Sequence, residues 1–277
     1  FAAGSSWAHK ITKGVEARQH KPVNTPTGPS MAATDVLEDQ TTTWAKWWQE
    51  GSTKRSRYPC SSHMQGPVRG INANTIKQVS KSFKAITSQV DGWHPRHFAA
   101  LSQEARQHLA TLFSIAEAAG IYPPSLRNNL VALIDKSDGG LRPITLFRAA
   151  YRLHAKIRPD VVREWAKKLD IPAINMAAGR QVTDATYRLM IRQGTSRGKD
   201  ATTAAADLLW DVRKAFENVE RDTLWEKGTN NGYPLDILRL SLASYEWERM
   251  LSMGLLVSGP IKPSRGIAAG SAFATFE

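Results

Sequence analysis

The stretch from Ala206 to Val219 constrains the fold of this chain more than any other part of the sequence. Its first half, Ala206 to Asp211, is an apolar run that ends in a carboxylate, and its second half has helical spacing. This pattern predicts a buried strand that is followed directly by a helix. The strand would bring Asp211 to the edge of a sheet, open to solvent. Because aspartate is also a common helix N-cap, the stretch alone leaves its function open.

Carboxylates on adjacent strands are the magnesium ligands of enzymes that join nucleotides, in which two Mg²⁺ ions bridge the triphosphate and the primer hydroxyl. The spacing of Asp211, Lys214 and Phe216 resembles the first catalytic motif of reverse transcriptases, especially those of non-LTR retrotransposons. The resemblance implies that Asp211 is catalytic and binds two Mg²⁺ ions in the complete enzyme, and that the carbonyl of Val212 adds a ligand. It also implies that Phe216 packs under the deoxyribose and excludes a 2′-hydroxyl.

A second group of candidate residues lies in a predicted hairpin. Two apolar runs, 130–134 and 141–144, flank the turn residues 137–140, a pattern that predicts an antiparallel pair of strands. Lys136 stands beside the turn and Arg142 on the returning strand, where two cations can neutralise a triphosphate. In reverse transcriptases a lysine and an arginine at such positions contact the incoming nucleotide, so the resemblance implies the same for Lys136 and Arg142. A solvated basic hairpin is the alternative.

The third candidate segment is glycine-rich and lies near the end of the sequence. Gly266 and Gly270 stand before an expected helix, and closely spaced glycines let the backbone approach a nucleotide or a template base. The segment resembles the second palm motif of the same family. The resemblance implies that Gly270 contacts the nucleotide and that Arg265, Gly266 and Ala269 contact the template. Ala269 departs from the family pattern, which has a glutamine there, and its side chain cannot make the template-positioning hydrogen bond.

The charge of the chain favours a polyanionic partner. Its 37 Lys and Arg residues against 25 Asp and Glu give a formal net charge of +12. Nucleic acid is the first expectation, because its phosphates release counterions when cations bind them, and an acidic membrane surface is the second. The single cysteine, Cys60, excludes an internal disulfide, and no apolar run is long enough to span a bilayer. We expect an intracellular protein that does not enter a membrane, with the nucleus as a candidate location.

Periodicity predicts helices over much of the remaining chain. The helix at 35–49 carries three tryptophans, which at helical spacing are more typical of packing than of base stacking. The helix from residue 147 to about 169 contains Pro159, which predicts a kink or a break. Residues 250–257 are expected to form one strand. The further helices are expected at 74–90, 102–120, from the run 179–185 through residue 191, from residue 222 to about 229, and 234–245.

These expectations combine into an α/β (α+β) fold, helix-rich with a small antiparallel sheet, as in the fingers and part of the palm of a right-hand polymerase. Residues 1–70 are expected to be a flexible basic linker with one Trp-rich helix, 71–200 a fingers-like region, and 201–277 a partial palm. The third palm motif of the family contains two adjacent aspartates, and no such pair occurs in the 277 residues. We therefore expect a fragment of a longer enzyme, inactive by itself.

The sequence thus predicts an RNA-directed DNA polymerase of the nucleotidyltransferase class, with an RNA template, a DNA primer, a dNTP and magnesium as its partners. An RNA-templated RNA polymerase is one alternative, although such enzymes normally carry a polar or small residue where this chain has Phe216. The other alternative is a basic RNA-binding module left from a decayed retroelement, which the substitution at Ala269 favours.

Overall fold

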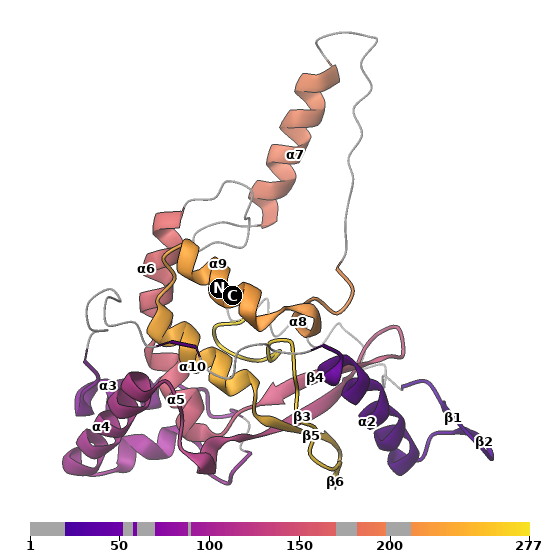
Figure 1. The fold of residues 1–277 in the computed structure, drawn as a ribbon, viewed down its shortest axis with the longest axis horizontal. Helices are drawn as coiled ribbons and strands as arrows, with labels where there is room; N and C mark the ends of the chain where they lie inside the picture. The colour runs from indigo at the N-terminus through magenta and orange to yellow at the C-terminus, as the bar shows by residue number, and fades with distance from the viewer. Residues whose placement is uncertain (1–19, 52–57, 60–69, 88–89, 170–181, 198–211) are drawn as a thin grey trace, which may run out of the picture.

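The computed structural model describes residues 20–51, 58–59, 70–87, 90–169, 182–197 and 212–277, and it is a mixture of helices and sheet, as the sequence predicts (Figure 1). Asp211 and the strand expected before it lie outside the described residues. The described α-helices are α2 (Ala33–Gln49), α3 (Ala73–Lys81), α4 (Gln103–Ala119), α5 (Ala149–Ile157), α6 (Pro159–Leu169), α7 (Val182–Arg197), α8 (Ala215–Asn218), α9 (Arg221–Asn230) and α10 (Leu235–Tyr245), and two short 3-10 helices are η1 (Pro95–Ala100) and η2 (Pro124–Leu126).

A four-stranded sheet with the order β4-β3-β5-β6 forms the frame of the molecule. Strands β3 (Asn128–Asp135) and β4 (Leu141–Leu146) form the predicted antiparallel hairpin. Strand β5 (Glu248–Met253) lies parallel to β3, with Leu251 opposite Val131, and β6 (Leu256–Val257) returns antiparallel to β5. The sheet therefore joins two parts of the sequence that are far apart, and one of its pairings is parallel rather than antiparallel.

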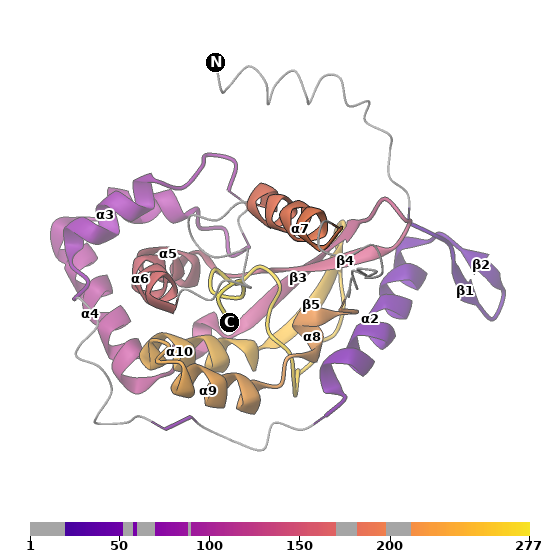
Figure 2. The same ribbon diagram turned by 90° about the horizontal axis from the view of Figure 1, so that it is seen from above.

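Helix α2 packs against strands β3 and β5 of this sheet, next to which it lies in Figure 2. Leu37, Trp44 and Trp48 of the helix pack with Val131 of β3 and Leu251 of β5, and all five side chains are buried. The rings of Trp44 and Trp48 lie 5.6 Å apart between centroids. Two of the three tryptophans are therefore core residues, which confirms packing rather than base stacking as their main contribution.

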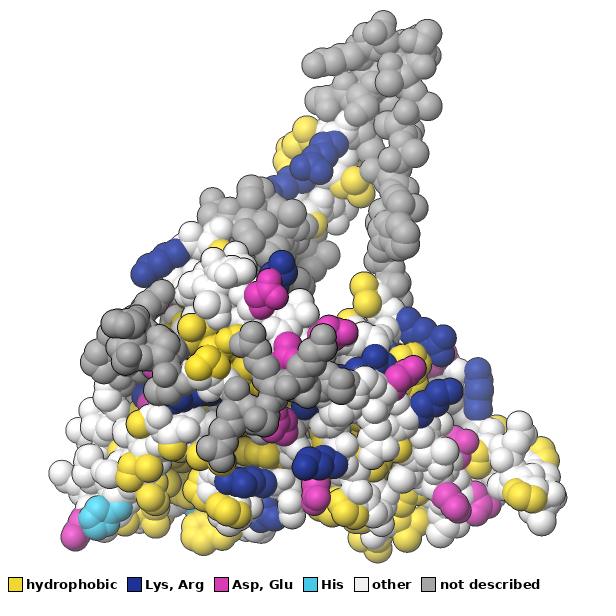
Figure 3. Space-filling model, in the orientation of Figure 1, with side chains coloured by type: hydrophobic (Ala, Val, Ile, Leu, Met, Phe, Trp, Pro, Cys, Tyr) yellow, Lys and Arg dark blue, Asp and Glu magenta, His cyan; other side chains and the backbone are white. Residues whose placement is uncertain are grey.

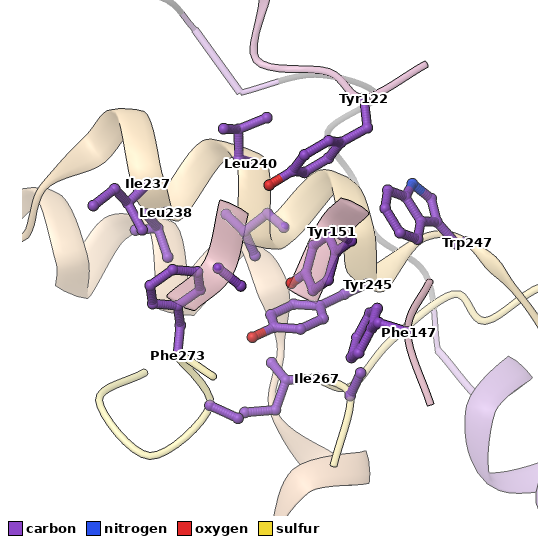
Figure 4. Packing of buried hydrophobic residues seen from close by; sticks show 14 of the residues in the cluster. Tyr122, Phe147, Tyr151, Ile237, Leu238, Leu240, Tyr245, Trp247, Ile267 and Phe273 are labelled. Carbon is purple, nitrogen blue, oxygen red and sulfur yellow. The ribbon is translucent and has the colours of Figure 1, made fainter. Parts of the chain in front are cut away.

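A second core is rich in aromatic side chains and joins α5, α6, α9 and α10 to residues 267–274 (Figure 4). Phe147 and Tyr151 stack at 4.3 Å between ring centroids, and Trp247 meets the ring of Tyr151 edge-on at 5.4 Å. Ile267 and Phe273 pack into the same cluster. Because burial of large aromatic side chains stabilises strongly, this core fixes the glycine-rich segment against the helices.

The third core lies between α3, α4 and α5, and its helix ends follow from local sequence. The Ser102 side chain accepts a hydrogen bond from the Ala105 amide at 3.1 Å, and Gly120 ends α4 in the left-handed conformation at φ 66°. Both features match the predicted helix. Pro159 begins α6 directly after α5, so the long helix expected here is two helices. No helix in the described part of the chain is long and apolar enough to cross a bilayer.

Several expectations about single elements were wrong. Residues 23–30, expected to be flexible, form a short hairpin of β1 (Val23–Thr25) and β2 (Gly28–Ser30), because Gly28 adopts φ 119° and the Thr25 hydroxyl donates to its carbonyl at 2.7 Å. Helix α3 ends at Lys81, nine residues before the expected end, and Ile86, which the expected helix would include, lies beyond it and is 90% exposed.

Two further corrections concern the end of the described chain. The strand expected at 250–257 is the β5–β6 hairpin, because Gly254 at φ 61° turns the chain back on itself. No helix follows Gly270 within the described residues. The amides of Ser271 and Phe276 instead close turns with the carbonyls of Ala268 and Phe273, at 3.0 and 2.8 Å. The glycine-rich segment is therefore an irregular loop fixed by packing.

Candidate functional site

The β3–β4 hairpin places two of the predicted site residues at one end of the sheet. The amide of Lys136 donates to the Gly140 carbonyl at 2.8 Å and closes the predicted turn, in which Gly139 has φ 76°. Lys136 Nζ lies 3.1 Å from Asp138 Oδ2 at the exposed turn. Arg142 is exposed and stands opposite Ile134 in the strand register. Both cations therefore lie near the solvent-exposed end of the hairpin, as the sequence predicts.

Residues 212–219 form the described part of the first candidate motif. Val212 is exposed, and the ring of Phe216 is 38% exposed at the first turn of α8. Lys214 has φ 53° and is the one residue other than glycine with positive φ in the part of the chain that the structure describes. The Asn218 side chain donates to the Arg213 carbonyl at 2.9 Å and holds this tight bend. Asp211, the predicted catalytic residue, lies outside the described residues.

The glycine-rich segment contacts both of these regions through its backbone. The Gly266 amide donates to the Val219 carbonyl at 3.0 Å, and the Ile267 amide donates to the Phe216 carbonyl at 2.8 Å. A Cβ atom on Gly266 would lie 2.9 Å from the Glu217 carbonyl oxygen, so only glycine fits without a shift of the backbone. The segment predicted as the second palm motif therefore lies directly against the segment predicted as the first.

The same segment reaches β4 at its other end. The Thr145 amide donates to the Ala269 carbonyl at 2.7 Å, and a Cβ atom on Gly270 would lie 2.5 Å from the Thr145 carbonyl oxygen. Gly270 also has φ 108°, which an L side chain rarely adopts. The three segments singled out in the sequence thus meet in the structure, with Gly266 beside Phe216 and Gly270 beside the hairpin that carries Lys136 and Arg142.

Arg265 is held by helix α2 instead of extending freely into solvent. Its Nε donates to the Trp47 carbonyl at 3.1 Å, and its Nη2 lies 3.2 Å from Glu50 Oε2. The Ser264 amide donates to the Trp48 carbonyl at 2.7 Å. The end of α2 therefore anchors the beginning of the glycine-rich segment, and the Arg265 guanidinium faces α2.

Buried Arg221, which sequence reasoning missed, holds the same loop from the inside. Its guanidinium donates to the carbonyls of Gly266, Tyr245, Arg265 and Pro263, at 3.0, 2.7, 3.0 and 3.3 Å. Such a set of carbonyl acceptors satisfies a buried guanidinium without a direct carboxylate contact. Burial is the largest influence on its pKa, which is lowered from the usual value for arginine. The sequence offers no signal for this contact, because an arginine at a helix start is ordinarily exposed.

Two further cations, to which the sequence analysis assigned no binding role, lie beside the tryptophans of α2. Lys214 Nζ lies 3.7 Å from the ring centroid of Trp44, and the Arg213 guanidinium lies 5.5 Å from that of Trp47. Burial lowers the pKa of Lys214, and the nearby charges of Lys136 and Arg213 lower it further, whereas Glu217 raises it. Lys136, Arg213 and Lys214, hereafter the cation cluster, therefore bring the hairpin and residues 212–214 into electrostatic contact.

The described residues do not by themselves fit a magnesium site. They contain no group of three or more His, Cys, Asp or Glu side chains that could hold a metal ion. Of the described carboxylates, that of Glu217 is nearest in sequence to Asp211. It is buried, and its negative charge raises the pKa of the buried Arg249 guanidinium. Burial is the main reason that the pKa of Arg249 falls to about 9, and Arg221 lowers it further. Glu217 is thus part of a buried charge cluster.

No protein-family model matches the chain, and no curated protein matches its sequence significantly.

Proposed function

We propose that this chain comprises the fingers and part of the palm of a reverse transcriptase of the non-LTR retrotransposon type, which copies RNA into DNA. The observation that carries the proposal is the convergence of three segments that the sequence predicts to share one site. Phe216, Gly266 and Gly270 lie on adjacent stretches of backbone, and the hairpin with Lys136 and Arg142 contacts the last of them.

The described geometry suits the binding of a nucleotide. The partly exposed ring of Phe216 offers a flat apolar surface for a sugar. The hairpin cations supply positive charge for phosphates. Two Mg²⁺ ions bound by Asp211 belong to the proposal, but the described residues add no cluster of ligands for them. We therefore derive no chemical step through the metal.

An RNA-binding module is the second candidate function. The cation cluster and the half-buried ring of Trp47 favour it, because cations interleaved with aromatic rings bind the backbone and bases of single strands. It differs from the first proposal in one measurable way, since an RNA-binding module has no reason to distinguish a deoxyribose from a ribose.

The proposal is tested by the affinity of the 277-residue chain for dTTP and for UTP with Mg²⁺, measured by isothermal titration calorimetry. We expect dTTP to bind about tenfold more tightly, because the Phe216 ring would collide with a 2′-hydroxyl. The Phe216→Ala variant should lose this preference. Tyr187→Ala, which removes an exposed ring on α7, should keep it. Equal affinities of the unaltered chain for dTTP and UTP would sink the reverse-transcriptase proposal.

A further inference from the structure

Lys214 is held in place before any ligand binds. Its backbone adopts the left-handed conformation at φ 53°, which is unfavourable for residues other than glycine, asparagine or aspartate. Its ammonium lies 3.7 Å from the ring centroid of Trp44. That ring is itself fixed, because Trp44 is buried and its Nε1 donates to Gln40 Oε1 at 3.1 Å. A cation with this little freedom loses little conformational entropy when it binds an anion.

Among the residues that the structure describes, the neighbourhood of Lys214 holds more positive than negative charge. Lys136 and Arg213 both act on it, and the side chain of Lys21 covers Gly139 at the same hairpin turn. Among the described residues, Asp138 pairs with Lys136 and Glu217 attracts Lys214, while Asp135 of the same hairpin lies 3.6 Å from His20 Nδ1. Figure 3 shows Lys and Arg side chains gathered on this side of the molecule, next to α8 and the β3–β4 hairpin. Like charges that a fold brings together repel one another unless an anion lies between them.

We propose that the cation cluster of Lys136, Arg213 and Lys214, positioned by Trp44 and Trp47 of α2, is a binding site for phosphate groups. The phosphates can belong to a free polyphosphate, such as the tail of a nucleotide, or to the backbone of a nucleic acid. The site adds two residues and the Trp-rich helix to those that the sequence predicts. This proposal concerns phosphate binding only, so it does not depend on whether the chain has a polymerase function.

Two titrations of the 277-residue chain test the proposal and separate the two sources of phosphate. Inorganic tripolyphosphate represents the free polyphosphate, and a fluorescein-labelled twelve-nucleotide oligouridylate, followed by anisotropy, represents the backbone. The variants are Lys136→Gln, Lys214→Gln and Lys214→Arg. Lys46→Gln is the matched control, because Lys46 is an exposed lysine on α2 itself.

We expect Lys136→Gln and Lys214→Gln each to weaken at least one of the two probes about fivefold or more, since each removes a charge-assisted contact. Lys214→Arg keeps both the charge and the contact with Trp44, so it should bind within about twofold of the unaltered chain. Lys46→Gln should bind as the unaltered chain does. Loss for tripolyphosphate alone identifies a free polyphosphate as the ligand, and loss for the oligonucleotide alone identifies the backbone.

The remaining outcomes overturn the proposal. If Lys136→Gln and Lys214→Gln bind both probes as tightly as the unaltered chain, the cluster is only a solvated surface. If Lys214→Arg loses binding as fully as Lys214→Gln, the charge is not what binds. If Lys46→Gln weakens binding equally, the effect is that of net charge and not of a site. Because none of these results involves dTTP preference or Phe216, failure here is distinguishable from failure of the reverse-transcriptase proposal.

Discussion

Two charged regions of this molecule are built in opposite ways. One is a buried ionic network of Tyr122, Glu117, His154 and Arg158, which joins α4 to α5 and α6. Arg158 Nε and Nη2 donate hydrogen bonds to the Glu117 carboxylate at 2.5 and 2.6 Å, and His154 Nε2 lies 2.8 Å from Glu117 Oε1. The Tyr122 hydroxyl completes the network at 2.5 Å from His154 Nδ1. The other region is the cation cluster, in which positive charges outnumber the neighbouring carboxylates of the described chain.

The pKa shifts in the network show how completely its charges are matched. Burial raises the pKa of Glu117, but hydrogen bonds from His154 and Arg158 outweigh burial and hold that pKa below its usual value. Burial lowers the pKa of His154, which favours the neutral ring that donates from Nε2 and accepts the Tyr122 hydroxyl at Nδ1. A closed network of this kind stabilises one arrangement of helices. Among the described residues the cation cluster has no closed set of partners of this kind, which is why we propose that its charges bind a ligand.

The largest expected effect is on the free energy of unfolding of the protein when the buried network is altered. Glu117→Gln leaves the buried guanidinium of Arg158 without its carboxylate, and we expect a loss of about 3 to 5 kcal/mol in the free energy of unfolding. Urea denaturation followed by circular dichroism measures it. Glu104→Gln, at an exposed position of the same helix, should lose less than about 1 kcal/mol.

Tripolyphosphate affinity of Glu117→Gln, measured where the variant is still folded, should equal that of the unaltered chain. If the stability of Glu117→Gln is unchanged, or if the folded variant binds tripolyphosphate more weakly, the account is contradicted. In that account the network stabilises the fold and the cation cluster binds phosphate.

A smaller effect is expected where the glycine-rich segment meets the sheet. Gly270→Ala places a methyl group against the Thr145 carbonyl in a backbone conformation that alanine avoids, and we expect a loss of about 2 kcal/mol in the free energy of unfolding. Gly259→Ala is the matched control, because Gly259 has no atom within 4 Å of its Cβ position and no left-handed φ. Equal stability of the two variants in the same denaturation assay would show that the contact with β4 is dispensable.

The parts of the fold that sequence reasoning predicted are those that neighbouring residues determine. Ser102 and Gly120 mark both ends of α4, and Pro159 divides α5 from α6, because a cap or a missing amide acts within one turn of helix. The β3–β4 hairpin was predicted for the same reason, since two strands joined by a glycine turn pair locally.

What the sequence could not provide depends on contacts between distant residues. The parallel pairing of β3 with β5 and the contact of Lys214 with Trp44 have no local signal. Even a local turn was missed at Gly254, because the residues around it are apolar and read as a continuous strand. The candidate site was therefore predicted as three segments. Their convergence, and the addition of Arg213 and Lys214, required the structure.

The central claim, that these segments form a nucleotide site organised by Asp211, is tested most directly by the magnesium dependence of dTTP binding. Calorimetric titration with Mg²⁺ and with EDTA should show tighter binding by the unaltered chain when magnesium is present. Asp211→Asn should bind dTTP equally in both conditions, because it lacks the carboxylate that holds the ion. The account is contradicted if magnesium has no effect on the unaltered chain while RNA still binds in a salt-dependent manner, which is the behaviour of an RNA-binding module.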